Sequence, residues 1–305
     1  MKRTQILLST YNGEAHLRAQ LDSFLALKGA EQISVLIRDD GSTDATRTIL
    51  AEYKEKHGFK VILGENVGLN ASMQILFEHA DPECFYFAYA DQDDVWLADK
   101  LTKAVAMLEN EDEALPVLYA ARSHITDVDG NIIGETLLPK RPPSFANAMV
   151  QNVCIGHTQV YNRAMLDLLR THYHRDMFVM DHWAYLLATA LGKVVFDPSL
   201  VTLYRQHGKN AIGYGNNLLS KIKSRSRRAR AGVPGAHTRQ LLALLDFEDE
   251  LKPTEAKMLR RFLAARKGFF RRLGYLFHAD AYRHGWIENA GFRTLFLLGS
   301  YNENK

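Results

Sequence analysis

Cysteine is nearly absent from this chain of 305 residues, which contains only Cys84 and Cys154. Two cysteines cannot form a disulfide framework, so the composition favours a reducing compartment. Cys154 has apolar neighbours, and we expect a buried thiol rather than a nucleophile. No apolar run approaches the roughly 20 residues that a helix needs to cross a bilayer, and the run at residues 6–8 is too short for a signal peptide. We expect a cytoplasmic protein, soluble or peripheral at a membrane.

A glycine-rich turn after the first strand is also lacking. The strand expected at residues 4–9 is followed by YNGE at residues 11–14, which contains a single glycine. Dinucleotide-binding sheets place several glycines at this turn, because the backbone must approach the pyrophosphate closely. The basic glycine-rich phosphate loop expected of a nucleotidyltransferase is missing too. The sequence therefore argues against an NAD or FAD enzyme and disfavours a nucleotidyltransferase.

Neither sign of charge is in large excess, since the formal net charge is +3. The distribution is nevertheless uneven. Residues 1–200 carry 18 basic and 27 acidic side chains, whereas residues 201–305 carry 20 basic and 8 acidic ones. Such asymmetry suggests two functional regions and an anionic partner for the second. The alternative is that the basic side chains form an ordinary solvated helical face.

What is present is an alternation of short β-branched or aromatic runs with helical patterns, which predicts parallel βαβ units and an α/β domain. A helix is expected at residues 180–191, and Ser42 or Thr43 is the expected N-cap of a helix that ends near Tyr53. After residue 216 the spacing is helical throughout. Strands are expected at residues 4–9, 33–38, 59–63, 84–90, 117–121, 193–196 and 200–204.

Polar side chains follow several of these strands. In open α/β sheets, ligands bind outside the carboxyl ends of the strands. Because the carboxyl ends of parallel strands meet at one edge, we expect a polar site there. The residues at these ends are Ser9, Thr10, Tyr11, Asn12, Asp39, Asp40, Asn66, Asp91, Asp93 and Asp94.

The continuous apolar run CFYFAYA at residues 84–90 predicts a strand buried on both faces, and Asp91 and Asp93 follow it. A D-x-D triplet alone is a weak signal, but its position at a strand end strengthens it. Residues i and i+2 of an extended chain point to the same side, and carboxylate oxygens suit Mg²⁺ or Mn²⁺. The alternative is that Asp94 or Asp99 caps the helix that follows.

Four segments in this order resemble family 2 glycosyltransferases of the GT-A fold, over roughly residues 4–215: LLSTYNGEAHLRAQLDSFLAL, IRDDGSTDAT, ENVGLNAS and AYADQDDVWLADKL. The segments QDDVW, MDHW and YRQHGKNAIG resemble most the bacterial rhamnosyltransferase branch, which transfers L-rhamnose from dTDP-rhamnose in surface-polysaccharide assembly. Transfer from UDP-hexose or UDP-N-acetylhexosamine on the same fold is the alternative. The resemblance implies a GT-A domain at residues 1–215, a Rossmann-like, mostly parallel sheet flanked by helices, before the basic helical region at residues 216–305.

The resemblance also implies a nucleotide-sugar site along the strand ends. Tyr11 would stack on the base, and Asp39 would accept a hydrogen bond from the pyrimidine N3–H. Asp39 has an alternative role as a helix-entry carboxylate. The residues implied to contact or shape this site are Ser9, Tyr11, Asn12, Asp39, Asp40, Asn66, Asp91, Asp94, Trp96 and Arg205.

The same resemblance implies a divalent metal, Mn²⁺ or Mg²⁺, with Asp93 as its main ligand and Asp91 beside it. Arg205 and His207 would approach the diphosphate, and His207 would complete the metal shell. A structural role is the alternative for His207. A non-catalytic nucleotide-sugar-binding protein of this fold is a further hypothesis, against which the retained Asp91, Asp93 and Asp181 argue.

Asp181, in the segment FVMDHW, is implied as the catalytic base that takes the proton of the acceptor hydroxyl. General-base assistance contributes typically about 10²–10⁴ in rate. Its alternative or additional role is to cap the helix at residues 183–191. The family commonly has a histidine before this aspartate, whereas His182 follows it, so we expect a packed His182. Gly156 and His157 lie in a stretch that resembles the acceptor-approaching segment of the family.

Three C-terminal segments mix basic with large apolar residues: 218–230, 258–277 and 286–298. Helices of this composition can lie on an anionic membrane surface, where a lipid-linked saccharide acceptor would wait. The alternatives are packing on the core and a homodimer contact. The segments contain no nucleic-acid recognition module, so we expect no nucleic-acid partner.

Overall fold

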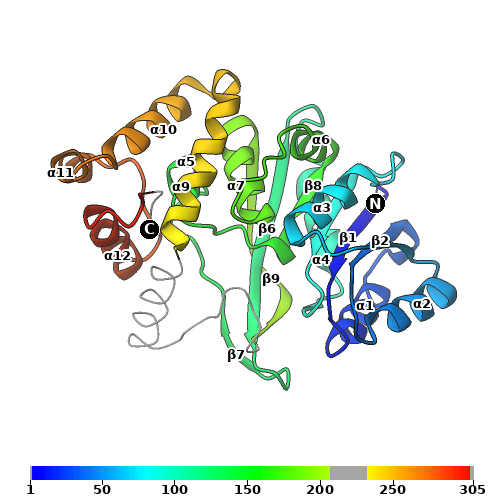
Figure 1. The fold of residues 1–305 in the computed structure, drawn as a ribbon. Helices are drawn as coiled ribbons and strands as arrows, with labels where there is room; N and C mark the ends of the chain where they lie inside the picture. Colours follow the sequence, from blue (N-terminus) through cyan, green and yellow to red (C-terminus); the bar gives the residue numbers. More distant parts are fainter. Residues whose placement is uncertain (1, 207–231, 303–305) are drawn as a thin grey trace.

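One mixed sheet organises the molecule (Figure 1). The computed structural model describes residues 2–206 and 232–302, so His207 and the basic segment 218–230 lie outside the described residues. Within that part, nine strands pair in the order β3-β2-β1-β4-β8-β6-β9-β5, and β7 pairs with β6. The strands are β1 (Thr4–Thr10), β2 (Ile33–Asp40), β3 (Lys60–Gly64), β4 (Tyr86–Ala90), β5 (Val95–Trp96), β6 (Val117–Thr126), β7 (Ile132–Glu135), β8 (Val160–Asn162) and β9 (Lys193–Arg205).

The N-terminal half of the sheet is parallel. β1 pairs in parallel with both β2 and β4, and β2 pairs in parallel with β3. Every residue of β1 and β4 is buried, which confirms the expected strand covered on both faces. This arrangement brings the carboxyl ends of β1, β2 and β4 to one edge of the sheet, where the candidate site lies.

The other half is mainly antiparallel. β8 runs antiparallel to both β4 and β6, while β6 runs parallel to β9. The two short strands expected at residues 193–196 and 200–204 are one strand, β9. Its register against β6 shifts after Phe196 and resumes at Leu200. Pro198 lies in the shifted stretch, and because proline cannot donate to a ladder it is tolerated at such an irregularity.

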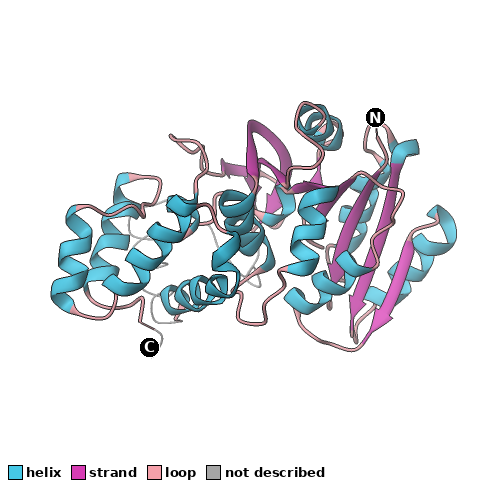
Figure 2. Cartoon of the chain, turned by 90° about the horizontal axis from the view of Figure 1, so that it is seen from above, coloured by secondary structure: helices cyan, strands magenta, loops and turns pink. Residues whose placement is uncertain are grey.

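Helices cover both faces of the sheet (Figures 1 and 2). Ile6 and Leu8 of β1 join the buried side chains of α1, α2 and α4, whereas Leu7 joins those of α3, α6 and α7. This division follows from the alternation of side chains along a strand. The helices are α1 (Leu17–Leu25), α2 (Thr46–His57), α3 (Leu69–Glu78), α4 (Lys100–Leu108), α5 (Phe145–Ala148), α6 (Arg163–Thr171) and α7 (Met180–Leu191).

The start of α2 differs from the prediction that Ser42 or Thr43 caps it. The helix begins at Thr46, and no side chain caps it at the preceding residue. Ser42 Oγ instead accepts the Asn12 backbone N–H at 2.9 Å, and Asn12 Oδ1 accepts the Thr43 N–H at 2.9 Å. The two residues are therefore used to tie the β2–α2 loop to the end of β1.

The C-terminal helices pack on the α/β part. Leu241, Phe262, Phe292 and Phe296 belong to the same buried cluster as Leu7 of β1, so the core is continuous. Figure 1 shows these helices at one end of the molecule, beside α5 and α7. Within the described ranges, every helix is too short or too polar to cross a bilayer. The helices are α9 (Val233–Ala243), α10 (Pro253–Ala265), α11 (Phe269–Phe277) and α12 (Trp286–Leu297).

Candidate active site

Hydrogen bonds cross-link the loops that follow β1, β2 and β4. The Gln92 side chain accepts the Tyr11 N–H at 2.9 Å and donates to the Tyr11 carbonyl at 3.1 Å. Asn12 has a φ of +47°, a left-handed conformation that asparagine tolerates, and this turn brings its side chain to Thr43. A Cβ on Gly13 would meet Gln92 Oε1 at 2.4 Å. The strand ends therefore form one connected rim.

Asp39 is fully buried at the end of β2. Its Oδ1 accepts the Ser42 N–H at 3.1 Å and the Arg47 Nε–H at 2.7 Å. Its Oδ2 has the Thr10 hydroxyl at 3.4 Å. The structure thus shows the loop-holding role of this carboxylate, and the contact of Oδ2 with Thr10 is the longest of the three.

Asp40 holds the loop after β3. Its two oxygens accept the N–H groups of Val67 and Gly68, each at 2.9 Å, and it is paired with the buried Arg38. Asn66, in the same loop, is exposed. Asp40 therefore shapes the loop that contains Asn66.

Asp91, Asp94 and His157 converge just beyond the end of β4. One potential ligand atom of each lies within 4.8 Å of the others. His157 Nδ1 is 3.2 Å from Asp94 Oδ2 and 3.8 Å from Asp91 Oδ2. His157 comes from the single turn η2 (Gly156–Thr158) that precedes β8. Asp94 and His157 are fully buried, whereas the Asp91 side chain is 35% exposed.

Burial and crowding shift the pKa values of this cluster. Desolvation, with the charge of Asp93, raises the pKa of Asp91 to about 7, and it raises the pKa of Asp94 well above the usual range. Burial lowers the pKa of His157 to about 3, so the imidazole is neutral and its contacts with the two carboxylates are not ion pairs. Burial also holds the pKa of Lys100 well below its usual range.

This donor set fits a divalent cation. Asp94 Oδ2 and His157 Nδ1 are buried and have no hydrogen-bond partner among the described residues. His157 Nε2 lies 2.8 Å from Ser123 Oγ, and a hydrogen bond from Nε2–H to that hydroxyl would leave Nδ1 as the coordinating nitrogen. A cation would also offset the mutual repulsion that raises the pKa of Asp91 and Asp94.

Asp93 lies beside the cluster but is not one of its three members. Its charge raises the pKa of both Asp91 and Asp94. Arg205, at the end of β9, holds this loop, since its backbone N–H donates to Asp94 Oδ1 at 3.2 Å and its Nε–H to the Asp93 carbonyl at 3.4 Å. Its guanidinium also donates to the Val128 carbonyl at 2.8 Å.

Trp96 packs in the core beneath the loop that carries Asp91 and Asp94, and its side chain does not reach the surface. The side chain is 2% exposed and packs edge-on to Phe24 with the ring centres 4.8 Å apart. The Lys100 ammonium lies 3.2 Å from the centre of the indole ring and donates to the His157 carbonyl at 2.5 Å. Lys100 thus links α4 to the residue that supplies the cluster's nitrogen.

Asp181 lies in the first turn of α7. Its Oδ2 accepts the Asn152 Nδ2–H and the Gly156 N–H, both at 2.9 Å, and its Oδ1 accepts the His182 N–H at 2.7 Å. Burial, with the charge of Asp91, raises the pKa of Asp181 to about 6. The Coulombic coupling places the candidate base and the acidic cluster in one electrostatic environment.

Gly156 permits this close packing. A Cβ at this position would lie 2.9 Å from Tyr89 Cε1 and 3.1 Å from Asp181 Cβ. Its N–H is also one of the donors to Asp181. Any larger residue would push Asp181 away from its present position.

A model described as Glycosyl transferase family 2 matches residues 5–169. The chain belongs to glycosyl transferase family 2. The matched range contains Asp39, Asp91, Asp93 and Asp94, whereas Asp181 lies beyond it. The membership confirms the resemblance inferred from the four sequence segments.

Several proteins are similar to this family 2 chain in sequence. An uncharacterized Mycobacterium tuberculosis protein is 27% identical over 209 residues, which cover 66% of this chain and 58% of that protein. The chain thus spans somewhat more than half the length of that relative. An uncharacterized glycosyltransferase of Nostoc is 27% identical, with 68% of this chain and 66% of that protein covered. A dTDP-rhamnosyl transferase of Shigella flexneri is 33% identical over 106 residues, or 33% of this chain and 36% of that protein.

Solved structures show the same fold at low identity. S. aureus TarS 1–349 in complex with UDP-GlcNAc has a TM-score of 0.57 and 15% identity, and the match covers 96% of this chain and 90% of that one. The Pyrobaculum calidifontis mannosyltransferase PcManGT, in complex with GDP-Man and Mn²⁺, has a TM-score of 0.52 and 16% identity, with 98% and 86% covered. The fold prediction, an α/β GT-A-like sheet flanked by helices, is confirmed.

Two capping alternatives for the acidic residues of this family 2 chain are wrong. The residue before α7 is Val179, no side chain caps the helix, and Asp181 is inside the first turn. The residue before α4 is Asp99, but its side chain makes no cap bond and instead pairs with Lys103 at 2.8 Å. Asp94 is held by Arg205 and is not a cap. Tertiary partners, rather than helix ends, therefore determine the positions of these carboxylates.

The expected packed His182 and buried Cys154 are confirmed. His182 is 2% exposed, its Nε2 is 2.6 Å from the Ala148 carbonyl, and burial lowers its pKa to about 4. Cys154 is a fully buried free thiol. At the rim, Tyr11 is 48% exposed, as a stacking platform requires. Ser9 is buried and hydrogen-bonded to Ser72 at 2.6 Å.

The sequence analysis did not find three contributors to this site. His157 was placed on the acceptor side, whereas among the described residues it is the histidine of the metal-ligand cluster. Lys100 and Asn152 were not identified as site residues. The signal for Lys100 was its place within the segment AYADQDDVWLADKL, and the signal for Asn152 was its place at the start of the stretch that contains Gly156.

Proposed function

We propose that the protein is a metal-dependent, inverting glycosyltransferase that uses a nucleotide-sugar donor. The observation that carries the proposal is geometric: the Gly156 N–H holds Asp181 at 2.9 Å, and the next residue, His157, joins Asp91 and Asp94 in the cluster. A base and a cation site that act on one sugar must be neighbours in this way. Membership of family 2 and the GT-A-like fold support it.

The chemistry follows from the residues. The acceptor hydroxyl would attack the anomeric carbon in line with the departing diphosphate, and Asp181 would take its proton late in the reaction. A divalent cation would supply charge neutralisation at the diphosphate. The family resemblance implies Asp93 as the main metal ligand. Asp93 is adjacent to the cluster of Asp91, Asp94 and His157, and we propose that it becomes a ligand once the diphosphate is bound. Asn152 and the Gly156 N–H orient the base by holding Oδ2.

For the donor we propose a pyrimidine nucleotide sugar, with dTDP-L-rhamnose as the best candidate. Tyr11 offers an exposed ring for stacking, and the family resemblance implies Asp39 as the acceptor for N3–H. Similarity to a dTDP-rhamnosyl transferase supports rhamnose. The complex of TarS with UDP-GlcNAc supports a UDP-hexose or UDP-N-acetylhexosamine as the alternative.

A donor panel tests this proposal. dTDP-rhamnose, UDP-glucose and UDP-GlcNAc are incubated with the protein and Mn²⁺ or EDTA, and release of nucleoside diphosphate is measured. We expect metal-dependent release from one donor. Binding without release, with or without candidate acceptors, would indicate the non-catalytic alternative, and absence of any metal-dependent binding would contradict the proposed function.

The acceptor we propose is a growing, lipid-linked surface polysaccharide at the inner face of the cytoplasmic membrane. On α11, Phe270 and Phe277 are 84% and 76% exposed, and Arg271 is exposed beside them. An exposed aromatic and basic helix face is suited to an anionic bilayer surface. Phe270→Ser with Phe277→Ser should abolish co-sedimentation with anionic vesicles, while Phe85→Ser, an exposed phenylalanine at the opposite edge of the sheet, should not. Equal binding by all variants would contradict membrane docking.

A further inference from the structure

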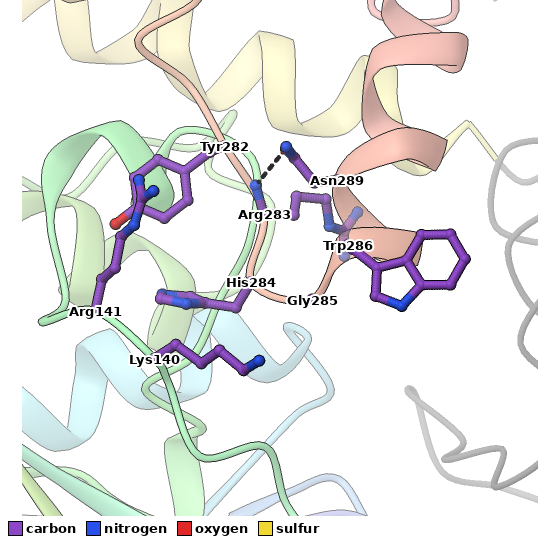
Figure 3. A pocket seen from close by; sticks show the side chains of 8 residues that line it. All are labelled: Lys140, Arg141, Tyr282, Arg283, His284, Gly285, Trp286 and Asn289. Atoms are coloured by element: carbon purple, nitrogen blue, oxygen red, sulfur yellow. Dashed lines mark hydrogen bonds between the residues drawn. The ribbon is translucent and has the colours of Figure 1, made fainter.

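A basic cavity, separate from the acidic cluster, lies between the loop before α5 and the segment that leads into α12 (Figure 3). It has a volume of about 190 Å³, far more than the roughly 10–15 Å³ that one water needs. The side chains of Lys140, Arg141, Arg283 and His284 line it, together with two aromatic residues, Tyr282 and Trp286.

The charge of this cavity is largely unbalanced. Lys140 and Arg141 are exposed and make no ion pair with a described residue. Arg141 lies over the Tyr282 ring, 5.1 Å from its centre, which holds the guanidinium at the cavity wall. Glu288 is the acidic group nearby, and its carboxylate is 3.9 Å from the Arg283 guanidinium. The cavity therefore retains an excess of positive charge.

His284 adds an independent indication that a ligand belongs here. The residue is 4% exposed, and its Nε2 is buried without a hydrogen-bond partner among the described residues. Figure 3 shows its ring pointing toward the side on which Arg141 and Lys140 lie. An unpaired buried polar atom costs free energy unless a ligand or water satisfies it. Trp286 begins α12, so the amino end of a twelve-residue helix also faces this region.

We propose that this cavity binds a phosphate group. Among the described residues, the unpaired cations of Lys140 and Arg141, with Arg283 and the unpaired imidazole of His284, suit a multivalent oxyanion. The 82% exposed ring of Trp286 offers an apolar face for the molecule that carries the phosphate. Two sources have this chemistry, a soluble saccharide phosphate and a lipid headgroup at the surface that α11 borders.

The cavity is connected to the candidate base through two adjacent residues. The His284 N–H donates to Gln151 Oε1 at 2.7 Å, and the next residue, Asn152, donates to Asp181 Oδ2 at 2.9 Å. A bound phosphate would therefore lie on the side of Asp181 that Asn152 holds. The next inference rests on the proposed function. If the protein is a glycosyltransferase, a phosphate site beside its base implies an acceptor that carries a phosphate group.

Tryptophan fluorescence tests the cavity directly. Of the three tryptophans, Trp96 and Trp183 are buried and Trp286 is 82% exposed, so iodide, itself an anion, quenches chiefly Trp286. With EDTA present to remove metal from the other site, inorganic pyrophosphate should protect Trp286 from iodide in the wild-type protein. In Arg141→Glu, half-protection should need at least about tenfold more pyrophosphate. Lys54→Glu, with the same charge change at an exposed position on α2, should match the wild type.

The source of the phosphate is tested with vesicles of phosphatidylcholine alone or with phosphatidylglycerol. Protection by pyrophosphate supports a soluble phosphate, and Arg141-dependent protection by anionic vesicles alone supports a headgroup. If neither probe gives protection that depends on Arg141, the proposal is overturned. Donor hydrolysis separates the two proposals, because Arg141→Glu should leave it unchanged. Protection without hydrolysis of any donor would reject the proposed transferase and keep the phosphate site.

Discussion

The replacement Asp181→Asn separates catalysis from stability at the candidate base. Burial raises the pKa of Asp181 from its ordinary value of 3.8 to about 6, and a tenfold change in a proton-binding constant corresponds to about 1.4 kcal/mol. Ionised Asp181 therefore costs the folded state up to about 3 kcal/mol at pH 7. Because the folded pKa is raised, the group favours folding below about pH 4, and this contribution is lost as the pH rises toward 6.

Asparagine removes this charge but keeps the shape. Its carbonyl oxygen can still accept from Asn152 and Gly156, whereas its amide nitrogen cannot accept the His182 N–H, a loss of about 1 kcal/mol. We expect the variant to be at least as stable as the wild type at pH 7 and less stable at pH 4. Nucleotide-sugar turnover should fall about 10²–10⁴-fold while donor binding persists.

Urea unfolding at pH 4 and pH 7 and release of nucleoside diphosphate are the measurements. Asp176→Asn, at an exposed position in the segment before α7, is the control and should change neither. Turnover at the wild-type rate would place the base elsewhere. If the variant is clearly less stable than the wild type at pH 7, then ionised Asp181 does not destabilise the folded state as the raised pKa predicts.

Three further outcomes are expected. Since Asp181 must be ionised to accept a proton, kcat/KM of the donor reaction, measured between pH 5 and 8, should rise through about pH 6 and then level; a flat profile would argue against this base. Gly156→Ala should reduce turnover at least about tenfold with the fold retained by circular dichroism, because the new Cβ would meet Tyr89 at 2.9 Å and displace the base. Asp94→Asn should remove the rise in unfolding temperature that Mn²⁺ gives, whereas Asp99→Asn should keep it; an unchanged Mn²⁺ response in both would exclude Asp94 as a ligand.

Local patterns in the sequence determined most of the α/β framework. The apolar run at residues 84–90 predicted a strand buried on both faces, and β4 is one. The periodicity at residues 180–191 predicted α7 with its observed bounds. The order of the strands along a parallel sheet then brought Asp39 and Asp91 to the same edge, because βαβ units all point the same way. These features follow from spacing between near neighbours, which the sequence displays directly.

Contacts between distant segments were decided by the tertiary structure. His157 joins Asp91 and Asp94 because β8 enters the sheet antiparallel to β4, which places the turn before β8 at the end of β4. Register within a strand pair and the direction of an inserted strand are set by packing of the whole core, so no local period reveals them. The capping predictions failed for the same reason. Ser42 accepts the Asn12 N–H and Asp94 accepts the Arg205 N–H, and both donors are far away in the chain.

Local sequence patterns thus sufficed for the parallel strands β1, β2 and β4, the acidic rim at their ends and the helix that carries Asp181. The tertiary structure alone decided which nitrogen completes the cation cluster, that Lys100 is buried beneath it, and that the loop at Arg141 meets the segment at His284 to form a basic cavity. The physical reason is that covalent spacing fixes which side of a strand or helix a residue occupies, whereas burial and the pKa shifts it causes depend on which segments pack together.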